Sequence, residues 1–125
     1  MLLAIDVGNT NTVFAVYDDN NFLVEWRCAT EASRTADEYY VWLSSLIEFQ
    51  VQKISISRVV ISSVVPQVIF NLTELGKKYF DFLPLIIGKA NCKLPVDVRV
   101  DEGANVGADR IVNTVAAFDR YGGNL

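Results

Sequence analysis

Three stretches near the start of the chain have the hydrophobic pattern of neighbouring β-strands. Residues 2–5 form a continuous apolar run, which is typical of a strand buried on both faces. Residues 13–17 are rich in β-branched and aromatic side chains, and residues 22–29 alternate in polarity. The mostly apolar face of the third stretch comprises Phe22, Val24, Trp26 and Cys28. Because short polar clusters separate the stretches, the pattern predicts an antiparallel meander of three strands.

Further along the chain, apolar residues recur at helical spacing. Thr35 and Glu38 have the spacing of a capping box, so a helix is predicted to begin after Thr35. The apolar side of this helix comprises Tyr39, Trp42, Leu43, Leu46 and Ile47. A second helix is predicted around Pro66, a residue that suits the first turn of a helix. Its apolar positions are Val65, Ile69, Leu72 and Leu75.

The remaining apolar runs are shorter. Residues 59–61 and 83–87 have the pattern of buried strands, and residues 96–100 alternate weakly between apolar and polar. A last helix is predicted from near Asn105 to Arg120, because its apolar residues have helical spacing and two glycines follow it as a stop. Strands and helices are therefore predicted along most of the chain, with only a weak strand signal between residues 89 and 100.

Composition narrows the functional classes. The chain has 125 residues, of which 51% are apolar, and this is enough for one domain with a sizeable core. Its net charge of −4 and its pI near 4.7 argue against a nucleic-acid partner, whose phosphates would require clustered Lys and Arg. The basic pair Lys77-Lys78 fits the end of a helix better. No apolar run approaches the roughly 20 residues that span a bilayer, so we expect a soluble, cytoplasmic protein without a membrane partner.

The chain contains no histidine and two cysteines. Without histidine there is no Ser-His-Asp or Cys-His machinery and no zinc site of the usual kind. A general base is therefore expected to be a carboxylate, with Lys, Tyr or Cys as the alternatives. Cys28 and Cys92 lie far apart in the sequence and have the pattern of reduced cytosolic thiols. A single disulfide between them is the alternative.

The first candidate site is the polar stretch Asp6-Val7-Gly8-Asn9-Thr10-Asn11-Thr12, between the first two predicted strands. Such a turn can direct backbone N–H groups and hydroxyls at an anion, while Asp6 offers hard oxygen ligands to Mg²⁺. A plain hairpin turn is the alternative, because Gly and Asn adopt tight turns readily. The stretch is neither a Walker A loop nor a dinucleotide-binding fingerprint, because neither glycine pattern is present.

Two further places carry candidate residues. Ser62 and Ser63 follow a predicted strand, where they either cap the next helix or line a cleft at the carboxyl end of the strand. Asp109 lies in the first turn of the last predicted helix, where it either complements the helix dipole or takes part in a site. Arg110 points about 100° further round that helix, so the two side chains can meet different partners.

Read together, these motifs resemble those of the type III pantothenate kinases. The resemblance is carried by the Asp6–Thr12 stretch, by Ser62-Ser63-Val64-Val65-Pro66, and by Gly107-Ala108-Asp109-Arg110-Ile111-Val112-Asn113 about a hundred residues after the first motif. It extends over the whole chain. The first motif alone is shared, in looser form, across the superfamily that contains acetate kinases, sugar kinases and actin. The motifs together, in this order, are much more specific.

The resemblance implies an α/β fold, a ribonuclease-H-like (actin-like ATPase) domain with a mixed sheet of three antiparallel strands followed by parallel strands, covered by helices. It also implies ATP-dependent phosphorylation of the primary hydroxyl of pantothenate, the first step toward coenzyme A. Asp6 would hold Mg²⁺ with the ATP phosphates, and Asp109 would be the catalytic base. The ATP-binding residues would be Asp6, Val7, Gly8, Asn9, Thr10, Asn11, Thr12 and Val13. The pantothenate-binding residues would be Gly107, Ala108, Asp109 and Arg110.

Members of this family are about twice as long as this chain. The resemblance therefore implies that residues 1–125 form a single N-terminal lobe, and that a second lobe with the adenosine pocket and a ligand for K⁺ or NH₄⁺ lies outside it. A homodimer is also implied. The chain has Val100 and Gly103 where many members have a tyrosine and a proline, so those two features are not carried over. Two alternatives stay open: a superfamily kinase that acts on another small hydroxyl substrate, and a non-catalytic regulatory accessory protein.

Overall fold

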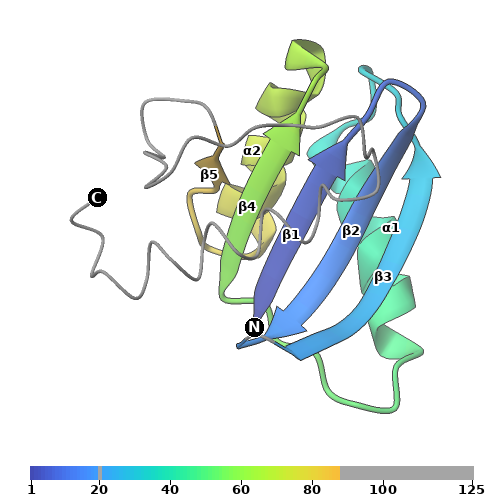
Figure 1. The fold of residues 1–125 in the computed structure, drawn as a ribbon, viewed down its shortest axis with the longest axis vertical. Helices are drawn as coiled ribbons and strands as arrows, with labels where there is room; N and C mark the ends of the chain where they lie inside the picture. Colours follow the sequence, from blue (N-terminus) through green and yellow to red (C-terminus); the bar gives the residue numbers. More distant parts are fainter. Residues whose placement is uncertain (20, 88–125) are drawn as a thin grey trace.

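One mixed β-sheet organises the described part of the chain, which is residues 1–19 and 21–87 of a computed structural model (Figure 1). Its strands are β1 (Leu2–Val7), β2 (Asn11–Asp18), β3 (Asn21–Ala29), β4 (Arg58–Ser63) and β5 (Leu85–Ile86). Their order across the sheet is β3-β2-β1-β4-β5, so β1 is the central strand. The first three strands are antiparallel, and β4 is parallel to both β1 and β5. The predicted meander and the predicted strand at residues 59–61 are confirmed.

Two helices, α1 (Ala36–Glu48) and α2 (Ile69–Tyr79), cover one face of the sheet (Figure 1). The predicted capping box is present, because the Thr35 hydroxyl accepts the Glu38 backbone N–H and the Glu38 carboxylate accepts the Thr35 N–H. Pro66 opens a short 3₁₀ helix, η1 (Pro66–Val68), that leads directly into α2. Both predicted helices are therefore confirmed, the second with a tighter first turn.

The main core lies between these helices and the sheet. Alternate residues of β1, β2 and β4 face α1 and α2, as the period of a strand requires. The buried strand residues on this side include Leu3, Ile5, Val7, Phe14, Val16, Val59 and Ile61. The Phe14 ring packs against the rings of Tyr39 and Trp42 on α1, with centroids 5.8 and 5.2 Å away. The strands that carry the candidate site are thus fixed to a rigid layer of helices.

The opposite face of the sheet has a second apolar cluster of Leu2, Ala4, Ala15, Tyr17 and Val60. Ala4 and Ala15 are completely buried, as are their neighbours in sequence on the helical side. The central strand β1 is therefore buried on both faces, which explains why its sequence is a continuous apolar run rather than an alternation.

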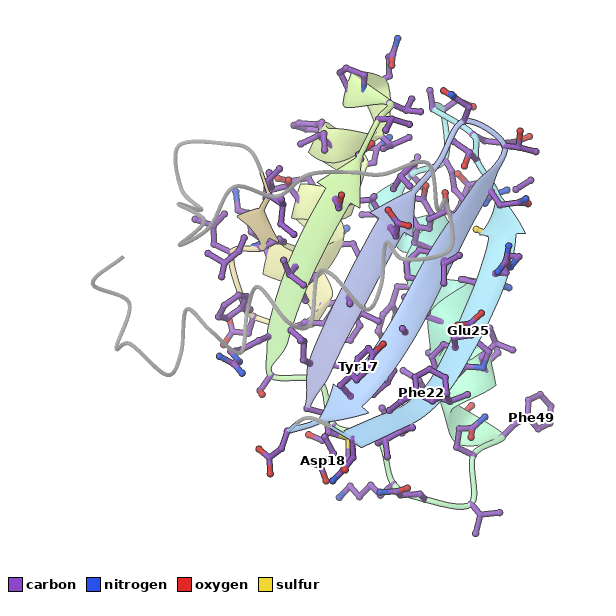
Figure 2. The ribbon with its side chains drawn as sticks, in the orientation of Figure 1. Tyr17, Asp18, Phe22, Glu25 and Phe49 are labelled. Atoms are coloured by element: carbon purple, nitrogen blue, oxygen red, sulfur yellow. The ribbon has the colours of Figure 1, made fainter. Side chains whose placement is uncertain are left out.

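A β-bulge changes the expected faces of β3. The residue pairs are Val16 with Val24 and Tyr17 with Phe22, so Leu23 is the extra residue. The alternation predicted from Phe22 to Cys28 therefore holds only from Val24 onward. Phe22 lies on the opposite face, where its ring packs edge-on against Tyr17 with a centroid distance of 5.6 Å (Figure 2).

Other differences concern the second half of the chain. The strand predicted over residues 83–87 is shorter, because Pro84 has no N–H for a ladder and regular pairing begins at Leu85. The predicted strand at residues 96–100 and the helix from residue 105 to residue 120 lie outside the described residues. Within the described ranges, no helix is long and apolar enough to cross a membrane.

Candidate functional site

The predicted polar turn connects β1 to β2 at one end of the central strand. The Gly8 N–H donates to the Asn11 carbonyl oxygen at 2.9 Å, which closes a tight hairpin over Asn9 and Thr10. The three residues at positions 9, 10 and 11 are exposed. A Cβ atom at Gly8 would lie 3.3 Å from that same carbonyl oxygen, closer than side chains normally approach. Glycine is therefore favoured here because the backbone folds so closely on itself.

A residue outside the turn holds it in place. Thr30, which directly follows β3, donates its backbone N–H to the Thr10 carbonyl oxygen at 2.9 Å and its hydroxyl to the Gly8 carbonyl oxygen at 2.8 Å. The hydroxyl oxygens of Thr30 and Thr12 lie 2.8 Å apart. Because the single proton of the Thr30 hydroxyl is directed at Gly8, Thr12 must be the donor in this last bond. The turn is thus hydrogen-bonded to the first residue of β2 and to the segment after β3.

Asp6 lies at the carboxyl end of β1, beside this turn. In the sheet it is paired with Val13 of β2 on one side and with Ser62 of β4 on the other. The side chain is half-buried on the face opposite the helices, and burial raises the pKa of the Asp6 carboxyl above its ordinary value. Among the described residues, no cation lies close enough to lower this pKa again.

The predicted ATP-binding residues divide into three groups by burial. Asn9, Thr10 and Asn11 are exposed in the turn, and Asp6, Gly8 and Val13 are half-buried. Val7 and Thr12 are buried, with exposed fractions of 1% and 0%. Their side chains face the helical layer, and both residues are paired within the sheet.

The two serines that follow the buried part of β4 point to opposite faces. Ser62 shares the face of Asp6, which agrees with the alternative that it lines a cleft at the carboxyl end of the strand. The Ser63 hydroxyl accepts the Val65 N–H and donates to the Val65 carbonyl, both at 2.8 Å. The N-cap of η1 is Val65, without a side-chain cap, so the expectation that the serines cap this helix is wrong.

The second predicted group, Gly107, Ala108, Asp109 and Arg110, lies outside the described residues, as do Cys92, Val100 and Gly103. Cys28 is a free thiol, with a guanidinium nitrogen of Arg34 at 3.1 Å from its sulfur. Burial raises the pKa of this thiol more than the neighbouring Arg34 lowers it. These features give Cys28 the character of an unreactive, structural residue.

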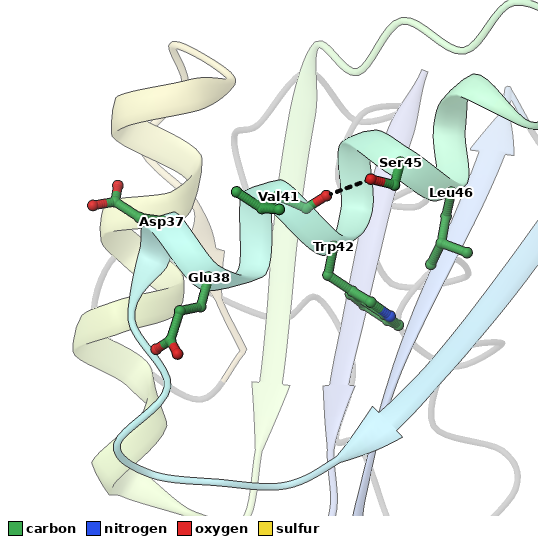
Figure 3. A pocket seen from close by; sticks show the side chains of 6 residues that line it. All are labelled: Asp37, Glu38, Val41, Trp42, Ser45 and Leu46. Carbon is green, nitrogen blue, oxygen red and sulfur yellow. Dashed lines mark hydrogen bonds between the residues drawn. The ribbon is translucent and has the colours of Figure 1, made fainter.

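A groove of about 590 Å³ lies along α1, and Figure 3 shows the side chains that line it. Its lining residues are Asp37, Glu38, Val41, Trp42, Ser45 and Leu46. The Ser45 hydroxyl donates to the Val41 carbonyl of its own helix at 3.0 Å, so this polar group is already satisfied. The groove offers no convergent set of polar groups and is not the candidate site.

Sequence comparison assigns the chain to a family. Residues 2–125 match the family model described as type III pantothenate kinase. The chain belongs to the type III pantothenate kinase family. It is 58% identical to the type III pantothenate kinase of Roseobacter denitrificans, 59% to that of Dinoroseobacter shibae and 54% to that of Paracoccus denitrificans, in each case over the whole chain. These alignments cover 48 to 49% of the relatives, so the chain spans about half the length of the curated relatives it matches.

Membership of a kinase family implies the use of ATP, and the resemblance of the motifs implies Mg²⁺ together with it. Within residues 1–19 and 21–87 there is no cluster of three metal-ligating side chains. Mg²⁺ does not require such a cluster, because it commonly binds through one or two carboxylates together with substrate phosphates and water. Asp6 is a half-buried carboxylate that no cation compensates among the described residues, and it lies beside an exposed turn with backbone donors, which fits that requirement.

Proposed function

We propose that the full-length protein transfers the terminal phosphoryl group of ATP to the primary hydroxyl of pantothenate. The observation that carries the proposal is the position of Asp6 at the carboxyl end of the central strand, beside the exposed Gly8–Asn11 turn, in a chain of this family. Phosphoryl transfer depends mainly on positioning and on neutralisation of charge, and a carboxylate for the metal beside a donor-rich turn supplies both.

In this proposal Asp6 and the turn bind the phosphates of Mg·ATP. The backbone N–H groups of the turn would donate to phosphate oxygens, as successive amides do in anion-binding turns. Asp6 would be a ligand of Mg²⁺, and the metal ion would neutralise charge on the phosphates. The buried side chains of Val7 and Thr12 would support the turn from the helical side, while Val13 would border the nucleotide from β2.

The acceptor half of the reaction is proposed from the second motif. Asp109 would accept the proton of the pantothenate hydroxyl, and Gly107, Ala108 and Arg110 would bind the rest of that substrate. A carboxylate with an ordinary pKa near 3.9 is ionised at neutral pH and can accept a proton that becomes acidic late in the reaction. This role is compatible with a chain that has no histidine.

We also propose that the sheet belongs to a ribonuclease-H-like domain, the N-terminal lobe of a two-lobed enzyme. Three antiparallel strands followed by parallel ones, in the order β3-β2-β1-β4-β5, support this assignment. A bound K⁺ or NH₄⁺, a homodimer and a cytoplasmic location complete the proposal and rest on family resemblance.

The test is a coupled assay of ADP release with the full-length protein, Mg·ATP and pantothenate. We expect turnover with pantothenate and none with a panel of other small hydroxyl compounds. The 125-residue chain alone is expected to have little or no activity, because nucleotide would bind between two lobes. Turnover with another hydroxyl compound but not with pantothenate would assign a different superfamily kinase, and no turnover with any would overturn the proposed function.

A further inference from the structure

The segment after β3 contacts the turn through Thr30, which lies outside the three sequence motifs. Thr30 reaches the turn with its backbone N–H, which bonds the Thr10 carbonyl, and with its hydroxyl, which bonds the Gly8 carbonyl. We propose that Thr30 is a positioning residue that sets the direction of the turn amides toward the nucleotide phosphates. The proposal rests on the proposed function and deepens it.

The direction of the amides follows from the geometry of the peptide unit. In a planar trans peptide, the carbonyl of one residue and the N–H of the next point in opposite directions. The described residues contain no cis peptide. Thr30 holds the carbonyls of Gly8 and Thr10, so the N–H groups of Asn9 and Asn11 point away from Thr30. Both residues are exposed, so we infer that these two donors are open to a ligand.

The hydroxyl network makes this arrangement specific. The Thr30 hydroxyl donates to Gly8 and accepts from Thr12, whose side chain is fully buried. A hydroxyl that both donates and accepts has a fixed orientation, and hydrogen bonds shielded from water are stronger than exposed ones. If Thr30 loses its hydroxyl, the Gly8 peptide is free to rotate and Thr12 is left without an acceptor.

The experiment compares Thr30→Val with Thr30→Ser in the full-length protein. Valine keeps the shape and strand preference of threonine but removes both hydroxyl bonds, whereas serine retains them. For Thr30→Val we expect the KM for Mg·ATP to rise about tenfold. This factor corresponds to the loss of one hydrogen bond between a turn amide and a phosphate oxygen. The KM for pantothenate is expected to change less than about twofold, and Thr30→Ser is expected to restore most of the affinity for Mg·ATP.

The matched control is Thr73→Val, which makes the same chemical change on α2, away from the turn. It is expected to leave both KM values unchanged. The inference is overturned if Thr30→Val leaves the KM for Mg·ATP unchanged. It is also overturned if Thr30→Val raises both KM values equally or if Thr30→Ser behaves like Thr30→Val, because those results indicate a general structural role.

A second measurement needs no variant and no turnover. In the wild-type protein, backbone amide resonances are followed by NMR while inorganic tripolyphosphate with Mg²⁺ is added. The Asn9 and Asn11 amides are expected to shift more than the Gly8 amide, whose N–H is already bonded to Asn11. Equal or absent shifts overturn the inference even where Thr30→Val fails to fold. If the amides shift as expected but pantothenate is not phosphorylated, the proposed function fails and the role of Thr30 in phosphate binding remains.

Discussion

Asp6 lies directly beside Ser62 in the parallel pair that β1 forms with β4. This pairing puts a carboxylate and a hydroxyl on the same face of the sheet, at the carboxyl end of its two central parallel strands. In sheets covered by helices, ligands gather at such ends because the loops that follow the strands open there. Because the carboxylate is half-buried, its charged form is partly desolvated in the free protein. A bound cation would offset this desolvation cost.

The first prediction concerns Asp6→Asn in the full-length protein. The amide cannot replace a charged metal ligand, so kcat/KM with Mg·ATP is expected to fall about a hundredfold or more. In the absence of nucleotide, the variant is expected to unfold at a higher temperature than wild type at pH 7, because it removes a half-buried charge. Steady-state kinetics over a range of Mg²⁺ concentrations and thermal unfolding would check both effects.

The sign of the pH effect follows from the raised pKa of Asp6. A carboxyl whose pKa is higher in the folded state stabilises the fold below its unfolded pKa, and this advantage is lost as the pH rises through the folded pKa. The stability gain of Asp6→Asn should therefore vanish near pH 3. The control is Asp18→Asn, at the end of β2 away from the turn (Figure 2), which should leave the Mg²⁺ dependence unchanged. Unaltered Mg²⁺ dependence in Asp6→Asn would remove Asp6 from the metal site.

The second prediction concerns Asp109→Asn, also in the full-length protein. Loss of a general base typically lowers the rate by about a hundredfold, so kcat is expected to fall by that factor while the KM for Mg·ATP stays the same. Asp119→Asn, ten residues further along, is the control and should leave kcat unchanged. A normal kcat in Asp109→Asn would return Asp109 to the helix-dipole alternative.

The third prediction tests the packing of α2. A Cβ atom at Gly76 would lie 2.4 Å from Cγ of Pro84 and 2.9 Å from the Phe82 carbonyl oxygen. Neither neighbour is a flexible side chain, so Gly76→Ala is expected to lower the free energy of unfolding by about 1–3 kcal/mol although alanine favours helices. Chemical denaturation would measure this. Lys77→Ala, an exposed neighbour, should change the free energy by less than about 0.5 kcal/mol, and an equal effect of both would contradict the steric argument.

The fourth prediction concerns the contact between the two helices. Lys78 donates to the Asp37 carboxylate at 2.8 Å, and the Tyr79 hydroxyl donates to the same oxygen. These two hydrogen bonds, Lys78 first, lower the pKa of Asp37. A carboxyl with a lowered pKa stabilises the fold above its unfolded pKa, and the contribution is lost as the pH falls through the folded pKa.

An NMR titration of the Asp37 carboxyl should therefore give a pKa below the usual value for aspartate. In Lys78→Gln this pKa is expected to rise, and the variant should be less stable than wild type at pH 6 but not at pH 2. Lys77→Gln, which removes an ion pair with Glu74 instead, should leave the Asp37 pKa in place. A pKa of Asp37 that does not respond to Lys78→Gln would contradict this account.

The sequence predicted the elements of the described fold well, because each has a strong local signal. The capping box at Thr35 marks the start of α1, and the apolar runs of β1 and β4 mark strands buried on both faces. The bulge at Leu23 was missed, because it depends on the pairing with β2 and not on the pattern of β3 itself. The predicted capping role of Ser62 and Ser63 failed, because both belong to β4 and Ser63 bonds the turn before η1.

The candidate site was predicted only in part, for a similar reason. Asp6 and the turn residues are contiguous, so a short motif identifies them. Thr30 is distant in the sequence, and its bonds to the turn depend on the register between β2 and β3. A threonine directly after a strand gives no signal until that register is known.

The arrangement of the sheet also bears on the order in which the site is assembled during translation. The turn, its two strands and Thr30 all come from the first thirty residues, so these contacts can form as soon as that segment leaves the ribosome. Asp6 gains Ser62 as a neighbour only when the crossover through α1 has brought β4 alongside β1. The contacts of the turn therefore need only the first thirty residues, whereas the surroundings of Asp6 need the chain up to residue 62.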